Sequence, residues 1–245
     1  TGVTTRGGKN HAHIVVDRAR EALLAEGAYE IETYSFVSPH DIEKLGLAAD
    51  DARLNPVRLL NPLGEDTSVM RTTLTPSMLQ TLSYNLNHGN PSALMFETAM
   101  RFEKTSEMAQ TPDGKLANLP NELNTLEIGM FGDDADFYRL KTIVDSLLTH
   151  FNETGKYAPD GDGYFHPGRK ARVSVNGKAL GQLGEIHPDV AAAFDMAGKR
   201  VYIAEIDLGT LDECEPPIEA PKPIPKFPAV SRDLALVMDE SQPVG

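Results

Sequence analysis

Arginine and histidine are the side chains of this chain with the clearest potential for chemistry. Arg101 stands in the segment MRFE, and His166 and Arg169 stand in YFHPGRK. A fixed guanidinium can bind a phosphate, and a histidine beside it can transfer a proton near neutral pH. Acidic residues surround Arg101, which favours a structural ion pair, and a lone histidine before Pro-Gly is typical of a turn.

The other histidines and the single cysteine do not follow a metal-ligand pattern. His11 and His13 are two residues apart, which on a helix places them on different faces. His187 precedes a proline and is expected to cap a helix. Cys214 has no second cysteine with which to form a disulfide. We therefore predict no catalytic, cofactor-binding or metal-binding residue in this chain.

The charge balance restricts the possible partners. The chain has 36 Asp and Glu residues against 23 Lys and Arg residues, a net charge of −13. A broad nucleic-acid surface needs clustered cations that displace counterions, so this composition argues against one. No apolar run approaches the about 20 residues of a membrane span, and no signal-peptide pattern opens the chain. The single cysteine fits a reducing compartment, so we expect a cytoplasmic protein without membrane contact.

Helices and strands alternate along the chain and would position these side chains. Apolar residues recur with the helical period over 10–26 and again after Asp136, which is a good N-cap residue. Thr75 is expected to cap a further helix that Pro76 enters and Gly89 ends. Strand patterns cover residues 30–37, 57–60, 67–72, 94–102, 123–131, 171–175, 179–186 and 201–208. This order predicts an α+β fold, with helices packed on a mixed sheet.

Two stretches interrupt the pattern. Residues 104–121 have no apolar period and predict a long loop between two strands of a hairpin. Residues 213–226 are rich in proline and predict an extended linker. The chain is therefore expected to divide into a core of residues 1–212, the linker, and a short final segment of residues 227–245.

Several segments together resemble the β subunits of bacterial phenylalanyl-tRNA synthetases, in the order in which those proteins carry them. They are NPLGEDTSVMRTTLTP, YNLNHGN, FETAMRFE, DFYRLKTIVDSLL, YFHPGRKARV, LGQLGEIHPDV and KFPAVSRDLALVMDE. The resemblance covers nearly the whole chain. It implies that residues 1–212 have the fold of class II aminoacyl-tRNA synthetases, an antiparallel sheet flanked by helices, without the catalytic residues. It also implies that residues 227–245 begin a ferredoxin-like anticodon-binding domain.

The same resemblance implies a function. In this family an (αβ)₂ heterotetramer attaches phenylalanine to tRNA(Phe), and its α subunit uses ATP and Mg²⁺. The β core would support the α subunit, with residues 10–37 as the subunit interface and Ile14 and Leu24 outside the apolar stripe of the helix. An active class II enzyme ends its last core strand with a glycine-rich segment and an arginine. Residues 201–211 carry Glu205 and Asp207 instead, so this chain alone is expected to bind no cofactor and to be inactive.

Two alternatives stay open at the level of the sequence. The chain could be a class II-like ligase with an altered site around Arg101, His166 and Arg169. It could also be a free-standing relative that acts as an acidic protein-interaction module.

Overall fold

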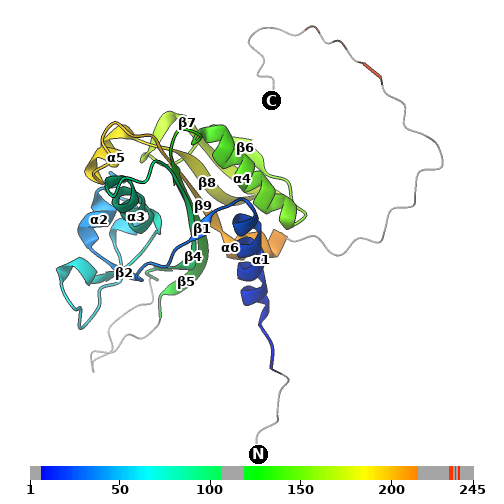
Figure 1. Ribbon diagram of the computed structural model, residues 1–245. Coiled ribbons are helices and arrows are strands. Elements are labelled where there is room, and N and C mark those ends of the chain that lie inside the picture. Colours follow the sequence, from blue (N-terminus) through cyan, green and yellow to red (C-terminus); the bar gives the residue numbers. More distant parts are fainter. Residues whose placement is uncertain (1–6, 106–118, 215–231, 234, 236, 238–245) are drawn as a thin grey trace, which may run out of the picture.

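The structure is a computed structural model that describes residues 7–105 and 119–214, together with residues 232, 233, 235 and 237. The described residues form a seven-stranded sheet with helices on both faces (Figure 1). The strands of this sheet are β1 (Tyr29–Glu30), β4 (Ala93–Glu103), β5 (Asn121–Phe131), β6 (Lys156–Ala158), β7 (Phe165–Val175), β8 (Lys178–Ile186) and β9 (Val201–Asp207). The fold is α+β, as the order of elements predicts.

The sheet is mixed, with the strand order β1-β4-β5-β9-β8-β7-β6. Every neighbouring pair is antiparallel except β1 and β4, which run parallel with Tyr29 opposite Met95. The expectation of an antiparallel sheet is therefore wrong at this edge. The connection from β1 to β4 is long enough to cross over the sheet and return in the same direction, which a parallel pair requires.

Two helical layers cover the two faces of the sheet. One face carries α1 (His11–Ala25), α4 (Phe137–His150) and α6 (Leu208–Cys214), and the other carries α3 (Thr75–Asn87) and α5 (Pro188–Ala193) (Figure 1). Beside α3 lie α2 (Pro39–Glu43), the two-stranded sheet of β2 (Phe36–Val37) and β3 (Val69–Met70), and the 3₁₀ turns η1 (Ala52–Leu54) and η2 (Glu65–Thr67). Each face has its own buried apolar cluster.

Local signals place the ends of the helices where the sequence predicts them. Asp136 caps α4 by accepting a hydrogen bond from the backbone N–H of Arg139. His187 caps α5 through its side chain, which accepts from the N–H of Asp189. Asn176 and Gly177 both have positive φ and join β7 to β8, as a type I′ turn requires.

Some expected elements differ in extent. The strand expected over 30–37 is split between β1 and β2, because the chain leaves the large sheet there and joins the small one. The strand expected over 67–72 is only β3, and β9 ends at Asp207. The last helix, α6, continues past the expected end of the core at residue 212. Residues 215–226 and most of residues 227–245 lie outside the described residues, so the linker and the final segment stay predictions.

No helix among the described residues is both long enough and apolar enough to cross a bilayer.

Candidate functional site

A row of polar side chains crosses the middle of the sheet. Glu97 of β4 lies opposite Glu127 of β5, which lies opposite Glu205 of β9, and Gln182 of β8 continues the row. Gly129, two residues after Glu127 on the same face of β5, lies beneath Met78 of α3. The row therefore lies on the face that α3 covers, in the middle of the sheet where a ligand site of this architecture would be expected.

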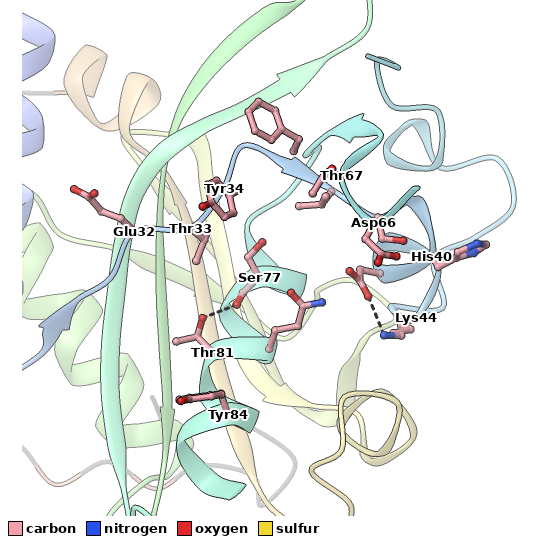
Figure 2. A pocket seen from close by; sticks show the side chains of 15 residues that line it. Glu32, Thr33, Tyr34, His40, Lys44, Asp66, Thr67, Ser77, Thr81 and Tyr84 are labelled. Atoms are coloured by element: carbon pink, nitrogen blue, oxygen red, sulfur yellow. Dashed lines mark hydrogen bonds and ion pairs between the residues drawn. The ribbon is translucent and has the colours of Figure 1, made fainter. Parts of the chain in front are cut away.

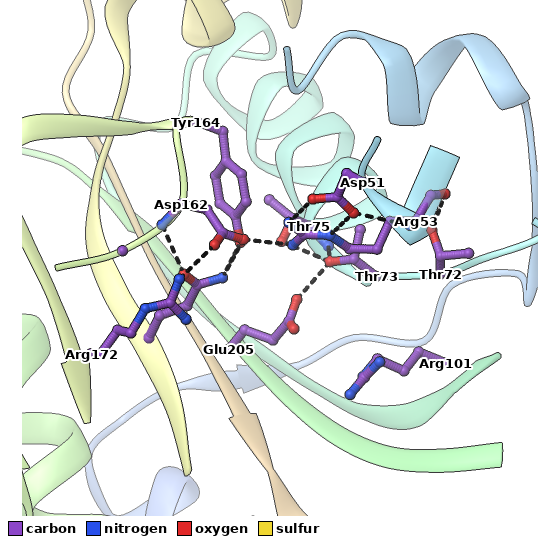
Figure 3. Close-up of polar contacts among 12 residues, drawn as sticks. Asp51, Arg53, Thr72, Thr73, Thr75, Arg101, Asp162, Tyr164, Arg172 and Glu205 are labelled. Atoms are coloured by element: carbon purple, nitrogen blue, oxygen red, sulfur yellow. Dashed lines mark hydrogen bonds and ion pairs between the residues drawn. The ribbon is translucent and has the colours of Figure 1, made fainter. Parts of the chain in front are cut away.

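Two threonines at the start of α3 contact the row: Thr75 is the first residue of the helix, and Thr73 precedes its N-cap residue Leu74. Thr75 Oγ1 donates to Glu127 Oε1 over 2.8 Å, and Thr73 Oγ1 donates to Glu205 Oε2 over 2.6 Å (Figure 3). The two hydroxyls are 3.1 Å apart. The expectation that Thr75 caps α3 is wrong: Leu74 is the N-cap residue, and the Thr75 hydroxyl is used by the buried carboxyl instead.

Glu127 is the most enclosed carboxyl of the row. Its side chain is fully buried, and its Oε2 has no hydrogen-bond partner among the described residues. Burial raises the pKa of Glu127 well above the ordinary value, and the nearby Glu205 carboxylate raises it further. Both effects favour the protonated, neutral form of the Glu127 carboxyl over the charged form.

Arg71 neutralises the end of the row at β4. Its guanidinium is 2% exposed, and Nη1 lies 3.1 Å from Glu97 Oε1. Arg71 also donates to the backbone oxygen of Met100 and to Thr33 Oγ1. Thr33 in turn donates both its N–H and its hydroxyl to the Glu97 carboxylate. This network attaches the segment between β1 and β2 to the large sheet.

A second arginine lies at the opposite end of the row. Arg53 forms ion pairs with Asp51 at 2.7 Å and with Asp162 at 2.6 Å (Figure 3). Gln182 donates to Asp162 and to the hydroxyl of the buried Tyr164. Burial opposes ionisation of Asp162, but the Gln182 hydrogen bond and the Arg53 charge outweigh it and lower its pKa. The buried Arg71 and the half-buried Arg53 are thus each paired with carboxylates of the same chain.

This arrangement does not fit a bound nucleotide triphosphate. Adenylate formation needs fixed cations where negative charge develops on the α-phosphate. The row instead offers Glu97, Glu127 and Glu205, and one carboxyl oxygen of each of the last two already accepts from a threonine of the same chain. A phosphate placed here would meet carboxylates before it met a free cation.

The predicted residues do not converge on one site. Arg101 forms ion pairs with Glu103 and, at 3.7 Å, with Asp207, so the structural ion pair expected for it is confirmed. The turn expected at His166 is wrong: His166 lies in β7, at a register irregularity between Phe165 and Lys170, and its Nδ1 accepts from the N–H of Gly168. Arg169 lies 2.8 Å from the buried Glu185 carboxylate. No contact joins these three side chains to one another within the described part of the chain.

The two histidines of α1, His11 and His13, also have separate partners. His11 pairs with Asp212 at 2.6 Å, whereas His13 contacts the N-cap residue Asn10. Cys214 is buried, and burial raises the pKa of its thiol. Within the described ranges, no three His, Cys, Asp or Glu side chains are grouped so that they could hold a metal ion. The predicted absence of a catalytic or ligand-binding residue stays a prediction.

Sequence reasoning missed Arg71 and Glu127, although both left a signal. Arg71 lies in the otherwise neutral segment SVMRTTLTP, and Glu127 interrupts the apolar part of the strand LNTLEIGMF. A charged residue inside a strand that is buried on both faces must be paired or neutral. That rule identifies both residues as members of a buried polar cluster, but it does not bring them together.

Comparisons with known proteins agree with the sequence segments that suggested a family. Residues 1–208 match the family described as "Phenylalanyl tRNA synthetase beta chain CLM domain". A phenylalanine–tRNA ligase beta subunit of Clostridium tetani is 39% identical over 240 residues, which are 97% of this chain and 29% of that protein. Those of Clostridium acetobutylicum and Syntrophus aciditrophicus are each 36% identical, over 96% and 95% of this chain and 29% of each relative.

The chain therefore spans less than a third of the length of these relatives. The family match covers both cores of the sheet and the whole polar row. On this evidence the chain belongs to the family of phenylalanyl-tRNA synthetase β-chain CLM domains.

Proposed function

We propose that this chain is the non-catalytic core of the β subunit of a phenylalanine–tRNA ligase. In this proposal residues 1–212 have the class II synthetase type of fold and assemble with an α subunit into a cytoplasmic (αβ)₂ heterotetramer. The α subunit attaches phenylalanine to tRNA(Phe) with ATP and Mg²⁺. The relatives' names and the family match support the assignment to the β subunit.

One observation carries the non-catalytic part of the proposal: the row of carboxyls and threonines in the middle of the sheet. Glu127 is fully buried and its pKa is raised, Glu205 accepts a hydrogen bond from Thr73, and the cation nearest to Glu97 is already paired with it. Arg101, the arginine that could resemble a catalytic one, is held by Glu103 and Asp207. These contacts disfavour a ligase with an altered site around Arg101, His166 and Arg169.

Exposed apolar side chains on the outer face of α1 favour a role of this chain in binding the α subunit. Val15, Ala19 and Leu23 are buried against the sheet, whereas Ile14 is 44% exposed and Leu24 is 51% exposed. Fully burying a leucine contributes about 1.5–3 kcal/mol. Because half of Leu24 is already buried, contact with a partner would contribute about half of that range. We propose that this face contacts the α subunit.

The test is capture of the α subunit by the β subunit with Leu24→Glu. A carboxylate in a contact that excludes water must be desolvated, so the variant should weaken capture at least about tenfold, which corresponds to about 1.4 kcal/mol. The melting temperature of the chain should stay nearly unchanged, since Leu24 is 51% exposed and does not belong to the buried core.

Leu63→Glu is the matched control, because Leu63 is 94% exposed and lies in a loop away from α1. It should capture the α subunit as the wild type does. Unchanged capture by Leu24→Glu would place the interface elsewhere. A collapse of its melting temperature would show that Leu24 belongs to the core.

The residues after the core have two proposed roles. The linker, expected over 213–226, would begin only after α6 ends at Cys214 and run to residue 226, and residues 227–245 would begin a ferredoxin-like anticodon-binding domain. The proline content of the first segment and the sequence KFPAVSRDLALVMDE of the second support this division.

A further inference from the structure

A groove lies on the α3 side of the molecule, away from α1. Its volume is about 1120 Å³, and three parts of the chain line it: the segment of residues 32–38, α2 together with η2, and α3. Figure 2 shows Tyr34, Ser77, Thr81 and Tyr84 on one side of the groove, with Asp66, His40 and Lys44 on the other. None of these side chains belongs to the polar row described above.

The wall formed by α3 is a polar helix face that is buried at Ser77 and exposed at Gln80 and Tyr84, where the Tyr84 ring stacks on His88. The residues Ser77, Gln80, Thr81 and Tyr84 follow the i, i+3, i+4, i+7 spacing of one helical face and line the groove. The opposite face of α3 packs on the sheet through Met78, Leu79 and Leu82. At the open end of this wall the Tyr84 ring is 63% exposed.

A second exposed ring comes from the segment between β1 and β2. Tyr34 is 77% exposed, and its ring stacks on Phe36, which also lines the groove, with centroids 6.3 Å apart. Two exposed tyrosines in one groove leave apolar ring area in contact with water, which is unfavourable in a free protein. Such rings are enriched where proteins contact partners.

The charges in the groove are unbalanced. The lysine and the histidine that line the groove both have carboxylate partners: Lys44 pairs with Asp41 at 2.8 Å, and His40 contacts Glu43 at 3.0 Å. Glu32 and Asp66 also line the groove, and neither has a hydrogen bond or ion pair within the described residues. The groove therefore presents two unpaired carboxylates next to exposed tyrosine rings.

We propose that this groove binds an arginine- or lysine-rich segment of another polypeptide. The aliphatic stems of such side chains would cover Tyr34 and Tyr84, and their cations would lie over the ring faces and against Glu32 and Asp66. A nucleic acid would bring phosphates to carboxylates, which is repulsive. The proposal does not depend on the subunit assignment, because the groove and α1 lie on opposite sides of the sheet (Figure 1).

Peptide binding to the 245-residue chain tests this proposal. The probe is a fluorescein-labelled peptide of about twelve residues with alternating arginine and leucine, and its binding is followed by fluorescence anisotropy. A second peptide has glutamate in place of arginine, and an RNA oligonucleotide of similar length carries the same label. Only the arginine peptide should bind, and the affinity should fall as the salt concentration rises.

Matched charge reversals locate the site. Glu32→Lys with Asp66→Lys should weaken binding at least about tenfold, because both unpaired carboxylates become cations. Asp133→Lys with Asp134→Lys makes the same change of net charge in an exposed turn outside the groove, and it should alter binding less than about twofold. Tyr84→Ala should also weaken binding without lowering the melting temperature, since the ring is exposed.

Four results would overturn the proposal. They are no binding of the arginine peptide, equal weakening by both double variants, binding of the glutamate peptide or the RNA with similar affinity, and displacement of the peptide by spermine at the same charge concentration. The second would show general attraction to an acidic chain, and the last would show a site for small cations. Thermal unfolding of each variant confirms that the fold is intact.

Discussion

Replacing Arg71 by methionine tests whether the buried network holds the β1–β2 segment on the sheet. The guanidinium is 2% exposed and contacts Glu97, Thr33 and the backbone of Met100. Removing one partner of a buried ion pair leaves the other charge buried and unpaired, which costs about 3–5 kcal/mol. For a chain of this size, about 2–4 °C of melting temperature corresponds to each kcal/mol. Arg71→Met should therefore melt about 6–20 °C below the wild type.

Urea unfolding followed by circular dichroism measures the change in the free energy of unfolding. Adding Glu97→Gln to Arg71→Met should recover part of the loss, since the unpaired charge is then absent. Arg172→Met is the matched control: its side chain is 48% exposed and pairs with Asp160 and Asp162 at the surface, so it should lose about 0–1 kcal/mol. A loss in Arg71→Met no larger than that of Arg172→Met would refute the reasoning.

Two further predictions concern the same face of the sheet. The pKa of Glu127 is raised in the folded chain above the ordinary value of a glutamate, so above that ordinary value the folded state binds more protons than the unfolded state. The stability of the chain therefore falls as pH rises from the ordinary pKa toward the raised one. Glu127→Gln should therefore be more stable relative to the wild type at pH 8 than at pH 5, and a difference that does not change between these two pH values would contradict the assignment. A Cβ added at Gly129 would lie 2.6 Å from Met78 Cγ and 2.9 Å from Leu82 Cδ1, so Gly129→Ala should cost about 1–3 kcal/mol in urea unfolding. Adding Met78→Ala should recover part of this loss, and a Gly129→Ala variant of wild-type stability would show that α3 does not pack closely on β5.

The elements with strong local signals are those that the sequence predicts correctly. The helix α4 has both its N-cap Asp136 and an uninterrupted apolar stripe, and the β7–β8 turn has Asn176-Gly177. These signals act between residues close in the chain, so no tertiary information is needed. The split of residues 30–37 into β1 and β2 has no such signal, because the two halves join different sheets and their partners, β4 and β3, lie far along the chain.

The candidate site depends on contacts that the sequence does not contain. Glu97, Glu127 and Glu205 become neighbours only through the register of three strands from distant parts of the chain. The sequence does show that Glu205 and Asp207 place negative charge on the last strand, and Glu205 lies in the polar row on the sheet face that α3 covers. Thr75 illustrates the limit of reasoning from sequence. Its position predicts a helix cap, but its hydroxyl donates instead to the buried carboxyl of Glu127 on β5.

The central claim is that this chain does not form phenylalanyl-adenylate. Phenylalanine-dependent exchange of pyrophosphate into ATP, measured with the 245-residue chain alone, tests it most directly. We expect no exchange above buffer, because Arg101, the arginine that reaches Asp207 at the end of β9, is held by Glu103 and Asp207. Exchange above buffer that is lost in Arg101→Ala would contradict the account.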